Sequence, residues 1–226
     1  MLYLHETIAL GSAREEQFVE AFETHHRPVL TDLGARLFAI WAATPFNGHW
    51  PQATVIWELD SYAAFADLGR ACSPGGSHAA AARRWRDFLA GVGASGEGRI
   101  AYPAAQNRPL ARLRAEGFAA GLVIEEIMRT KPGRQRDYIR ELQRLYVPWS
   151  ERTGKRWLGS WITAFRSDEV IHYWALDGEW DTFAEHYPSF GPDPDPELVT
   201  WMHVAPALRD GWEDTILTAL PPNPLR

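Results

Sequence analysis

The pattern of apolar and polar positions in the first half of the chain predicts six regular elements. Apolar residues recur at every second position in some segments, as in strands, and at every third or fourth position in others, as in helices. Stretches rich in glycine, proline and serine separate these segments. The predicted strands are 2–10, 36–43, 53–59 and 99–103, and the predicted helices are 13–33 and 62–92, the second interrupted at 73–77.

The second half of the chain repeats this order of elements. Its predicted strands are 120–129, 155–163, 169–176 and 214–220, and its predicted helices are 134–153 and 179–212, the second interrupted by a proline-rich insert at 187–196. Each half therefore has the order β-α-β-β-α-β, which is that of a ferredoxin-like unit.

Residue identities indicate that the two halves are copies of one another. A shift of 120 positions places like residues together, and after a shortening by three residues Trp57 meets Trp174. Tryptophan and proline are too uncommon to coincide so often by chance, and self-similarity at a fixed period indicates repeats. We predict repeats at 1–110 and 120–226, joined by a connector at 111–119. The coinciding pairs include Leu2 and Leu122, Glu6 and Glu126, Pro28 and Pro148, Gly34 and Gly154, and Trp41 and Trp161.

A four-stranded sheet with helices on one side leaves its other face to be covered. The simplest arrangement packs the sheets of the two repeats against each other, which forms a dimeric α/β barrel within one chain. The predicted fold class is therefore α+β, with two ferredoxin-like repeats packed sheet to sheet. Most of the eleven tryptophans are then expected to be buried.

Composition narrows the function classes. A net charge of −6 and a pI near 5.8 argue against nucleic-acid binding, which needs clustered basic residues. No apolar run approaches the roughly 20 residues that span a bilayer, and the N-terminus does not read as a signal peptide. The lone Cys72 is consistent with a reducing compartment. We expect a cytoplasmic protein that binds a small-molecule substrate, without nucleic-acid or membrane partners; a homo-oligomer stays open.

Several motifs resemble the NIPSNAP-like branch of the dimeric α/β barrel proteins. The second repeat matches that pattern over essentially its whole length, and a closing Asn-Pro-Leu is similar too. The first repeat departs from it, with Ala39 before Trp41 and Val55 where the second repeat has His172. The matching motifs are Pro132-Gly133, Pro148, Gly154, Gly159-Ser160-Trp161 and His172-Tyr173-Trp174.

The resemblance implies the fold but leaves the function open. The superfamily holds cofactor-free oxygenases, isomerases and cyclases, haem enzymes and proteins of unknown role, so that fold alone does not settle the activity. Relatives with two repeats hold haem between a helix and the sheet through one histidine. On that likeness His203, or else His186, is the expected ligand if haem is bound.

Two glutamates are the first candidates for chemistry. Glu6 and Glu126 each share a strand face with apolar neighbours, where an ionised carboxylate needs a partner or a raised pKa. His25 lies on the predicted apolar face of its helix, and we expect it to reach Glu6 as a base and its orienting group. His26 is predicted to lie at the helix edge in solvent. Structural roles, such as an ion pair or a backbone hydrogen bond, remain the alternative for each residue.

His172 shares a strand face with Trp174, and with Glu126 it forms the alternative catalytic site. A purely structural histidine packed between indoles is an equal alternative. Aromatic side chains of both repeats are predicted to line a pocket for an aromatic ligand, unless they belong to the core. The candidate ligand-binding residues are Trp41, Trp57, Tyr146, Trp161 and Trp174.

The sequence holds no pattern of metal ligands, since adjacent histidines at 25 and 26 diverge on a helix. The inserts at 72–78 and 187–196 are candidate lids over a pocket mouth. We therefore predict an enzyme that acts on a small apolar or aromatic metabolite by cofactor-independent acid–base chemistry, namely isomerisation, cyclisation or oxygenation. A haem enzyme and a non-catalytic ligand-binding protein are the alternatives.

Overall fold

The computed structural model describes residues 1–226, which divide into two compact units. Unit 1 comprises Met1–Pro45, His49–Ala101 and Ala219–Pro224. Unit 2 comprises Phe46–Gly48, Tyr102–Thr218 and Leu225–Arg226. Each unit therefore contains most of one predicted repeat plus a short segment from the other repeat. The repeat boundaries proposed at 110 and 120 stay a prediction.

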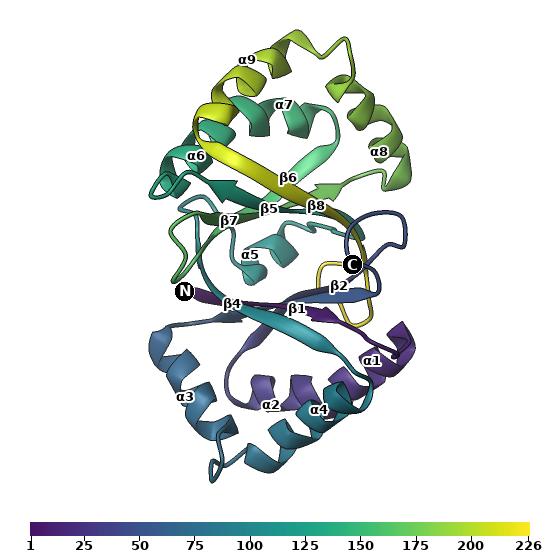
Figure 1. Ribbon diagram of the computed structural model, residues 1–226, viewed down its shortest axis with the longest axis vertical. Helices are drawn as coiled ribbons and strands as arrows, with labels where there is room; N and C mark the ends of the chain where they lie inside the picture. The colour runs from purple at the N-terminus through teal and green to yellow at the C-terminus, as the bar shows by residue number, and fades with distance from the viewer. The chain divides into compact units, whose positions relative to one another are not determined.

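Unit 1 is a four-stranded antiparallel sheet, in the order β4-β1-β3-β2, with helices on one face (Figure 1). Its order along the chain is the predicted β-α-β-β-α-β. The strands are β1 (Leu2–Ala9), β2 (Arg36–Ala43), β3 (Gln52–Leu59) and β4 (Ser95–Pro103). The helices are α1 (Glu15–Ala21), α2 (Arg27–Asp32), α3 (Tyr62–Cys72) and α4 (Ala79–Gly91).

Unit 2 has the same plan, with the strand order β8-β5-β7-β6. A short helix α5 (Leu110–Ala115) precedes it. The strands are β5 (Leu122–Thr130), β6 (Lys155–Thr163), β7 (Glu169–Leu176) and β8 (Arg209–Ala219). The helices on the sheet are α6 (Gln135–Glu141), α7 (Val147–Arg152), α8 (Trp180–His186) and α9 (Pro196–Val204), with 3-10 turns at Tyr187–Phe190 and Ala205–Ala207.

Each unit has its own hydrophobic core between its helices and its sheet. In unit 1 the largest side chains in this layer include Phe18, Phe22 and Trp57, all fully buried. In unit 2 the layer includes Tyr138 and Trp174, also fully buried. Burial of a large aromatic side chain contributes about 2–3 kcal/mol, so these layers hold the helices on the sheets.

The long helix of each repeat contains a π-helical turn, at Phe22–His26 and at Leu142–Tyr146. The amide of Arg27 donates to the carbonyl of Phe22, a bond to the fifth preceding residue rather than the fourth. Pro28 follows in the next turn; it has no amide hydrogen and its ring crowds the carbonyl four residues earlier. The wider turn relieves that conflict, and it rotates every side chain after it relative to a regular α-helix.

The last strand begins earlier than the sequence predicts. Helix 179–212 was expected to reach Trp212, but α9 ends at Val204 and β8 starts at Arg209. Pro206 ends the α-helix, because it has no amide hydrogen to continue the hydrogen-bond ladder, and only a 3-10 turn follows. A β-bulge also occurs near the start of β8, where Arg129 pairs with Gly211 but the next residue, Thr130, pairs with Arg209.

The eight strands have the order β1-β3-β2-β8-β5-β7-β6-β4 of a closed antiparallel barrel, which confirms the predicted α+β fold class. No helix is both long and apolar enough to cross a bilayer. The cytoplasmic location stays a prediction.

Candidate functional site

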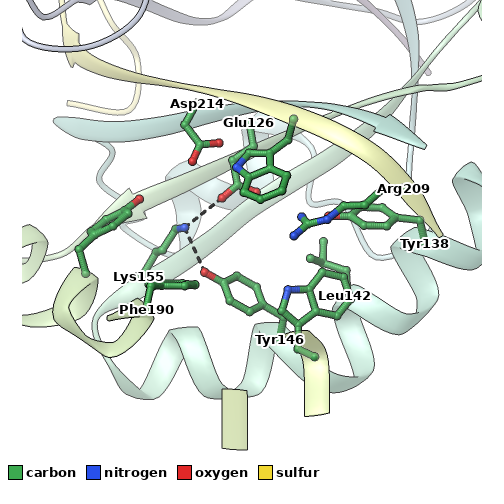
Figure 2. Close-up of a pocket in the computed structure, with 11 residues that line it drawn as sticks. Glu126, Tyr138, Leu142, Tyr146, Lys155, Phe190, Arg209 and Asp214 are labelled. Carbon is green, nitrogen blue, oxygen red and sulfur yellow. Dashed lines mark hydrogen bonds and ion pairs between the residues drawn. The ribbon is translucent and has the colours of Figure 1, made fainter. Parts of the chain in front are cut away.

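A cavity of about 230 Å³ lies in unit 2, between the sheet and the helices that cover it (Figure 2). It combines a mainly aromatic wall with two carboxyl groups and two basic groups. Trp212 is 56% exposed and Phe190 is 38% exposed, so the rim reaches the surface. The lining residues are Glu126, Tyr138, Leu142, Tyr146, Lys155, Tyr187, Phe190, Trp201, Arg209, Trp212 and Asp214.

A buried ion pair forms one side of the cavity. Lys155, the first residue of β6, is 1% exposed, and its Nζ lies 3.1 Å from Oε1 of Glu126. The same ammonium donates to the hydroxyl of Tyr146 at 3.2 Å (Figure 2). It also lies 4.9 Å from the ring centroid of Trp174, a favourable cation–π distance. Burial alone disfavours a charged lysine, but Glu126 raises the Lys155 pKa well above its usual value.

A second carboxyl group faces the same cavity. Asp214 of β8 stands directly opposite Glu126 of β5 in the sheet register. Side chains at such positions project from the same face and lie close together. Burial, and then the negative charge of Glu126, raise the Asp214 pKa to about 7, against the lowering effect of Lys155. Burial acts on Glu126 too, but Lys155 and His172 hold its pKa below the usual value.

The two carboxyl groups therefore have different protonation states near neutral pH. Glu126 is ionised and paired with Lys155, whereas Asp214 is divided between acid and base. When the pKa values of two neighbouring carboxyl groups differ in this way, one group can act as the electrostatic stabiliser and the other as the proton carrier. The buried Oδ1 of Asp214 has no hydrogen-bond partner.

Arg209 reaches the cavity because of the bulge in β8. Simple alternation along a strand would place residues 209 and 214 on opposite faces. The extra residue, Asp210, restores the face, so that Arg209 stands opposite Thr130 on the same side of the sheet as Glu126. Its guanidinium lies 4.0 Å from the ring centroid of Trp212 and 5.7 Å from that of Trp201.

Tyrosine hydroxyls supply further polar atoms. Tyr138 is fully buried, and its hydroxyl has no hydrogen-bond partner. Burial raises the pKa of both Tyr138 and Tyr146, so both remain neutral hydrogen-bond donors at physiological pH. The wall thus contains hydrogen-bond donors and a cation that have no full set of partners within the protein and can bind a ligand.

His172 lies beneath the cavity wall rather than in it. It is fully buried, pairs with Glu126 across β5 and β7, and its Nδ1 lies 2.6 Å from Oγ of Ser160. Burial lowers its pKa to about 4, so the ring is neutral. Its ring centroid is 5.4 Å from that of Tyr138. The catalytic role predicted for His172 stays a prediction; its position supports Tyr138 and Glu126 from behind.

In unit 1 the structure corrects the predicted pair of Glu6 and His25. His26, not His25, contacts Glu6, with Nε2 3.0 Å from Oε2, and Trp57 donates to the same oxygen at 2.7 Å. His26 is 8% exposed, whereas it was expected in solvent. The physical reason is the π-helical turn, which rotates residue 26 onto the sheet-facing side. The ring of Trp85 stacks on His26 at 4.7 Å and closes this cluster.

We predict that replacing His26 by leucine lowers the free energy of unfolding by about 2 kcal/mol, because Glu6 loses a partner in a mostly buried site. Burial raises the Glu6 pKa, but His26 and Trp57 bring it below its usual value, so the carboxylate left behind is charged. His25→Leu is the matched control and should change stability by less than about 0.5 kcal/mol. Urea denaturation measures both, and equal losses would contradict the π-helical register.

The predicted ligand-binding aromatic residues divide by sheet face. Tyr146 lines the cavity of unit 2. Trp57 and Trp174 lie on the helix-facing side of their sheets but within the core. Trp41 pairs with Thr54, and Trp161 pairs with Ile171; both therefore lie on the opposite face. The ligand contacts proposed for these four tryptophans stay predictions.

The residues around the cavity do not fit a haem. Neither predicted ligand lines it: His203 is exposed on α9, and His186 is buried with Nδ1 2.7 Å from Oγ1 of Thr153. The cavity volume of about 230 Å³ is also below the roughly 300–1,000 Å³ of pockets for drug-sized ligands, so it suits a ligand smaller than a haem. The structure contains no group of three or more His, Cys, Asp or Glu side chains placed to hold a metal ion.

Sequence reasoning missed Lys155, Arg209 and Asp214. Lys155 was assigned only to the start of a strand, although a lysine among apolar strand residues signals a buried partner. Arg209 was placed in a helix, and the stop signal at Pro206 with Gly211 beyond it would have indicated the earlier strand. Once β8 is recognised, Asp214 falls on the face of Glu126. The insert at 187–196 does contribute Tyr187 and Phe190 to the wall, and its role as a lid stays a prediction.

Solved structures share this fold over nearly the whole chain. An anthrone oxidase-like protein matches with a TM-score of 0.62 and 11% identity, over 97% of this chain and 91% of its own. A provisionally assigned monooxygenase from Fusobacterium nucleatum matches with a TM-score of 0.57 and 11% identity, over 97% and 92%. At such identities the likeness shows the fold alone.

A NIPSNAP domain protein is also among the structural neighbours. This protein, from Burkholderia xenovorans, matches 48% of this chain and 100% of its own at 20% identity, with a TM-score of 0.37. No protein-family model matches the sequence, and no curated protein matches it. The closed barrel and the two full-length matches show the dimeric α/β barrel fold, and unit 2 contains an aromatic cavity with a buried ionic cluster.

Proposed function

We propose that the protein is an enzyme that removes a proton from an acidic C–H or O–H group of a small aromatic substrate, without an organic cofactor. The observation that carries this proposal is the pair of opposed carboxyl groups in the unit 2 cavity. One, Glu126, is fixed as an anion by Lys155; the other, Asp214, has a free oxygen and a pKa of about 7. A base is most effective when its pKa lies near the working pH.

The proposed reaction begins with transfer of the substrate proton to the Asp214 carboxylate. The electron pair left on carbon delocalises into the substrate's carbonyl or ring oxygen. The Lys155 ammonium and the Tyr146 hydroxyl, which are 3.2 Å apart, supply positive charge and a donor to stabilise that oxygen. Return of the proton to another carbon gives isomerisation, and reaction of the carbanion with dioxygen gives oxygenation.

The names of the structural neighbours favour oxidation of an aromatic substrate within this class. One neighbour is named as anthrone oxidase-like, and another as a provisionally assigned monooxygenase. The mainly aromatic wall is suited to a flat ring system, since ring contacts add about 0.5–1.5 kcal/mol beyond the area buried. For unit 1 we propose a structural role, because Trp85 covers its Glu6–His26 cluster.

The proposal is tested by proton exchange in D2O. The two-ring ketone 2-tetralone and the three-ring ketone anthrone both carry an acidic CH2 group. With the wild-type protein, deuterium should enter that group faster than in buffer alone, as followed by ¹H NMR, and an oxygen electrode reports whether oxidation follows. Binding of these ketones without any proton exchange would contradict the proposed enzyme activity and would instead indicate a ligand-binding protein.

A further inference from the structure

Arg209 is a cation in the cavity without a carboxylate partner. Lys155 pairs with Glu126, but the guanidinium of Arg209 forms no ion pair. Its contacts include the faces of Trp201 and Trp212, the neighbouring hydroxyl of Tyr138, and a 3.6 Å approach of Nη1 to the sulfur of Met128. A guanidinium has five N–H donors and a thioether is a weak acceptor. Most of these donors therefore lack a strong acceptor from the protein.

The charges of the cavity do not balance around Arg209. Lys155 and Glu126 cancel each other as an ion pair. Asp214 carries only part of a negative charge near neutral pH. The uncompensated charge is thus about +0.5 at pH 7 and approaches +1 as Asp214 gains its proton at lower pH, which leaves room for a single anionic group on the ligand.

The two polar regions of the cavity are separate. Figure 2 shows Lys155 and Asp214 toward one side and Arg209 with Tyr138 toward the other. The indole of Trp212, which lines the cavity, lies at a β8 position between those of Arg209 and Asp214. The bulge in β8 lies between Gly211 and Arg209 and brings the Arg209 side chain to this face of the sheet. Bulges next to functional sites often reorient a side chain in this way.

We propose that the cavity takes an aromatic carboxylate of about two rings, with its carboxylate bound by Arg209 and its reacting end at Asp214. Planar guanidinium and carboxylate groups form two parallel hydrogen bonds, which gives orientation as well as affinity. The guanidinium carbon lies over the rings of Trp201 and Trp212, and these ring contacts supply no strong acceptor for its N–H donors. The inference deepens the proposed function and rests on it for the reaction at Asp214, but the binding assignment stands on Arg209 alone.

Two matched probes test the assignment: 2-naphthoate and the neutral 2-naphthalenemethanol, titrated by calorimetry at pH 6.5. The wild type should bind 2-naphthoate at least tenfold more tightly than the alcohol. Arg209→Gln should abolish that preference and leave the affinity for the alcohol unchanged. Arg209→Lys should keep part of the preference, since lysine retains the charge but not the paired donors. The control Arg129→Gln changes an exposed arginine on β5 and should keep the full preference.

Equal affinities of the wild type for the two probes would overturn the proposal, as would a preference that survives in Arg209→Gln. Failure here is distinct from failure of the proposed function, because Asp214→Asn should lose proton exchange and keep the preference for 2-naphthoate. A preference without exchange in the wild type would remove the reaction and keep Arg209 as the anion-binding residue. Proton exchange without a preference for 2-naphthoate would keep the reaction at Asp214 and reject Arg209 as the anion-binding residue.

Discussion

Replacing Lys155 by methionine is expected to lower the free energy of unfolding by about 3–5 kcal/mol. Methionine fills the space of the lysine stem but removes the ammonium. The carboxylate of Glu126, whose side chain is 11% exposed, is then left without its cation, and the hydroxyl of Tyr146 loses its donor. Leaving one member of a buried ion pair unpaired costs more than the pair contributes, because the remaining charge stays desolvated. Urea denaturation at pH 7 measures the loss.

The double variant Lys155→Met/Glu126→Gln separates this cause from lost packing. Removing both charges should restore stability to within about 1–2 kcal/mol of the wild type, because no buried charge is left unpaired. Glu126→Gln alone should also be destabilising, since it strands an ammonium that is 1% exposed. A double variant as unstable as Lys155→Met would show that packing, not charge, accounts for the effect.

Replacing Asp214 by asparagine is expected to lower the exchange rate of 2-tetralone by about 100-fold or more, the usual contribution of a general base. In the wild type the rate should rise with pH as Asp214 loses its proton and level off above about pH 7. Asparagine cannot accept the proton, so the inflection should disappear with the activity. Asp181→Asn changes an exposed aspartate on α8 of the same unit and should keep both the rate and the pH profile. A wild-type rate in Asp214→Asn would refute the assignment.

The same variant is expected to be more stable than the wild type at high pH. The pKa of Asp214 is higher in the folded protein than in the unfolded chain, so its stabilising effect is full below pH 3.8 and is lost as pH rises through about 7. A rise from 3.8 to about 7 corresponds to at most about 4 kcal/mol, and solvent at the rim reduces the expected gain to about 2 kcal/mol. Melting temperatures at pH 4 and pH 8 measure the difference, which should appear only at pH 8.

A gain in stability together with a loss of exchange is typical of a functional site, where a destabilising group is kept for its chemistry. Asp214 is a candidate of this kind, because its carboxyl stands opposite another carboxyl in the same sheet. Glu6 in unit 1 has no such neighbour and is fully paired with His26 and Trp57. The duplicated glutamates thus differ in their surroundings rather than in their position.

Much of the fold follows from the sequence. Strand β2 and strand β7 have the predicted bounds 36–43 and 169–176, because their apolar positions are bounded by turn residues. The internal repeat predicts that Glu6 and Glu126 occupy equivalent strand positions, and both face the helices. The predicted fold class is confirmed by the strand order and by the matching solved structures.

The candidate site follows from the sequence only in part. Glu126 and Tyr146 are among the predicted residues and line the cavity, whereas Lys155, Arg209 and Asp214 were not predicted. Sequence spacing assumes a constant rotation per residue. An inserted residue breaks that assumption. The chain contains one such insertion in a helix, at the π-helical turn Phe22–His26, and one in a strand, at the bulge of β8.

The sequence by itself determined the duplication, the order of strands and helices, and the apolar faces that build each core, because these depend on periodicity over many residues. Only the tertiary structure decided which side chains meet. One added residue in a helical turn exchanged His25 for His26 at Glu6, and one in β8 brought Arg209 to the sheet face that carries Asp214. Each shift costs local hydrogen bonds that packing offsets elsewhere, and that balance is set by contacts distant in sequence.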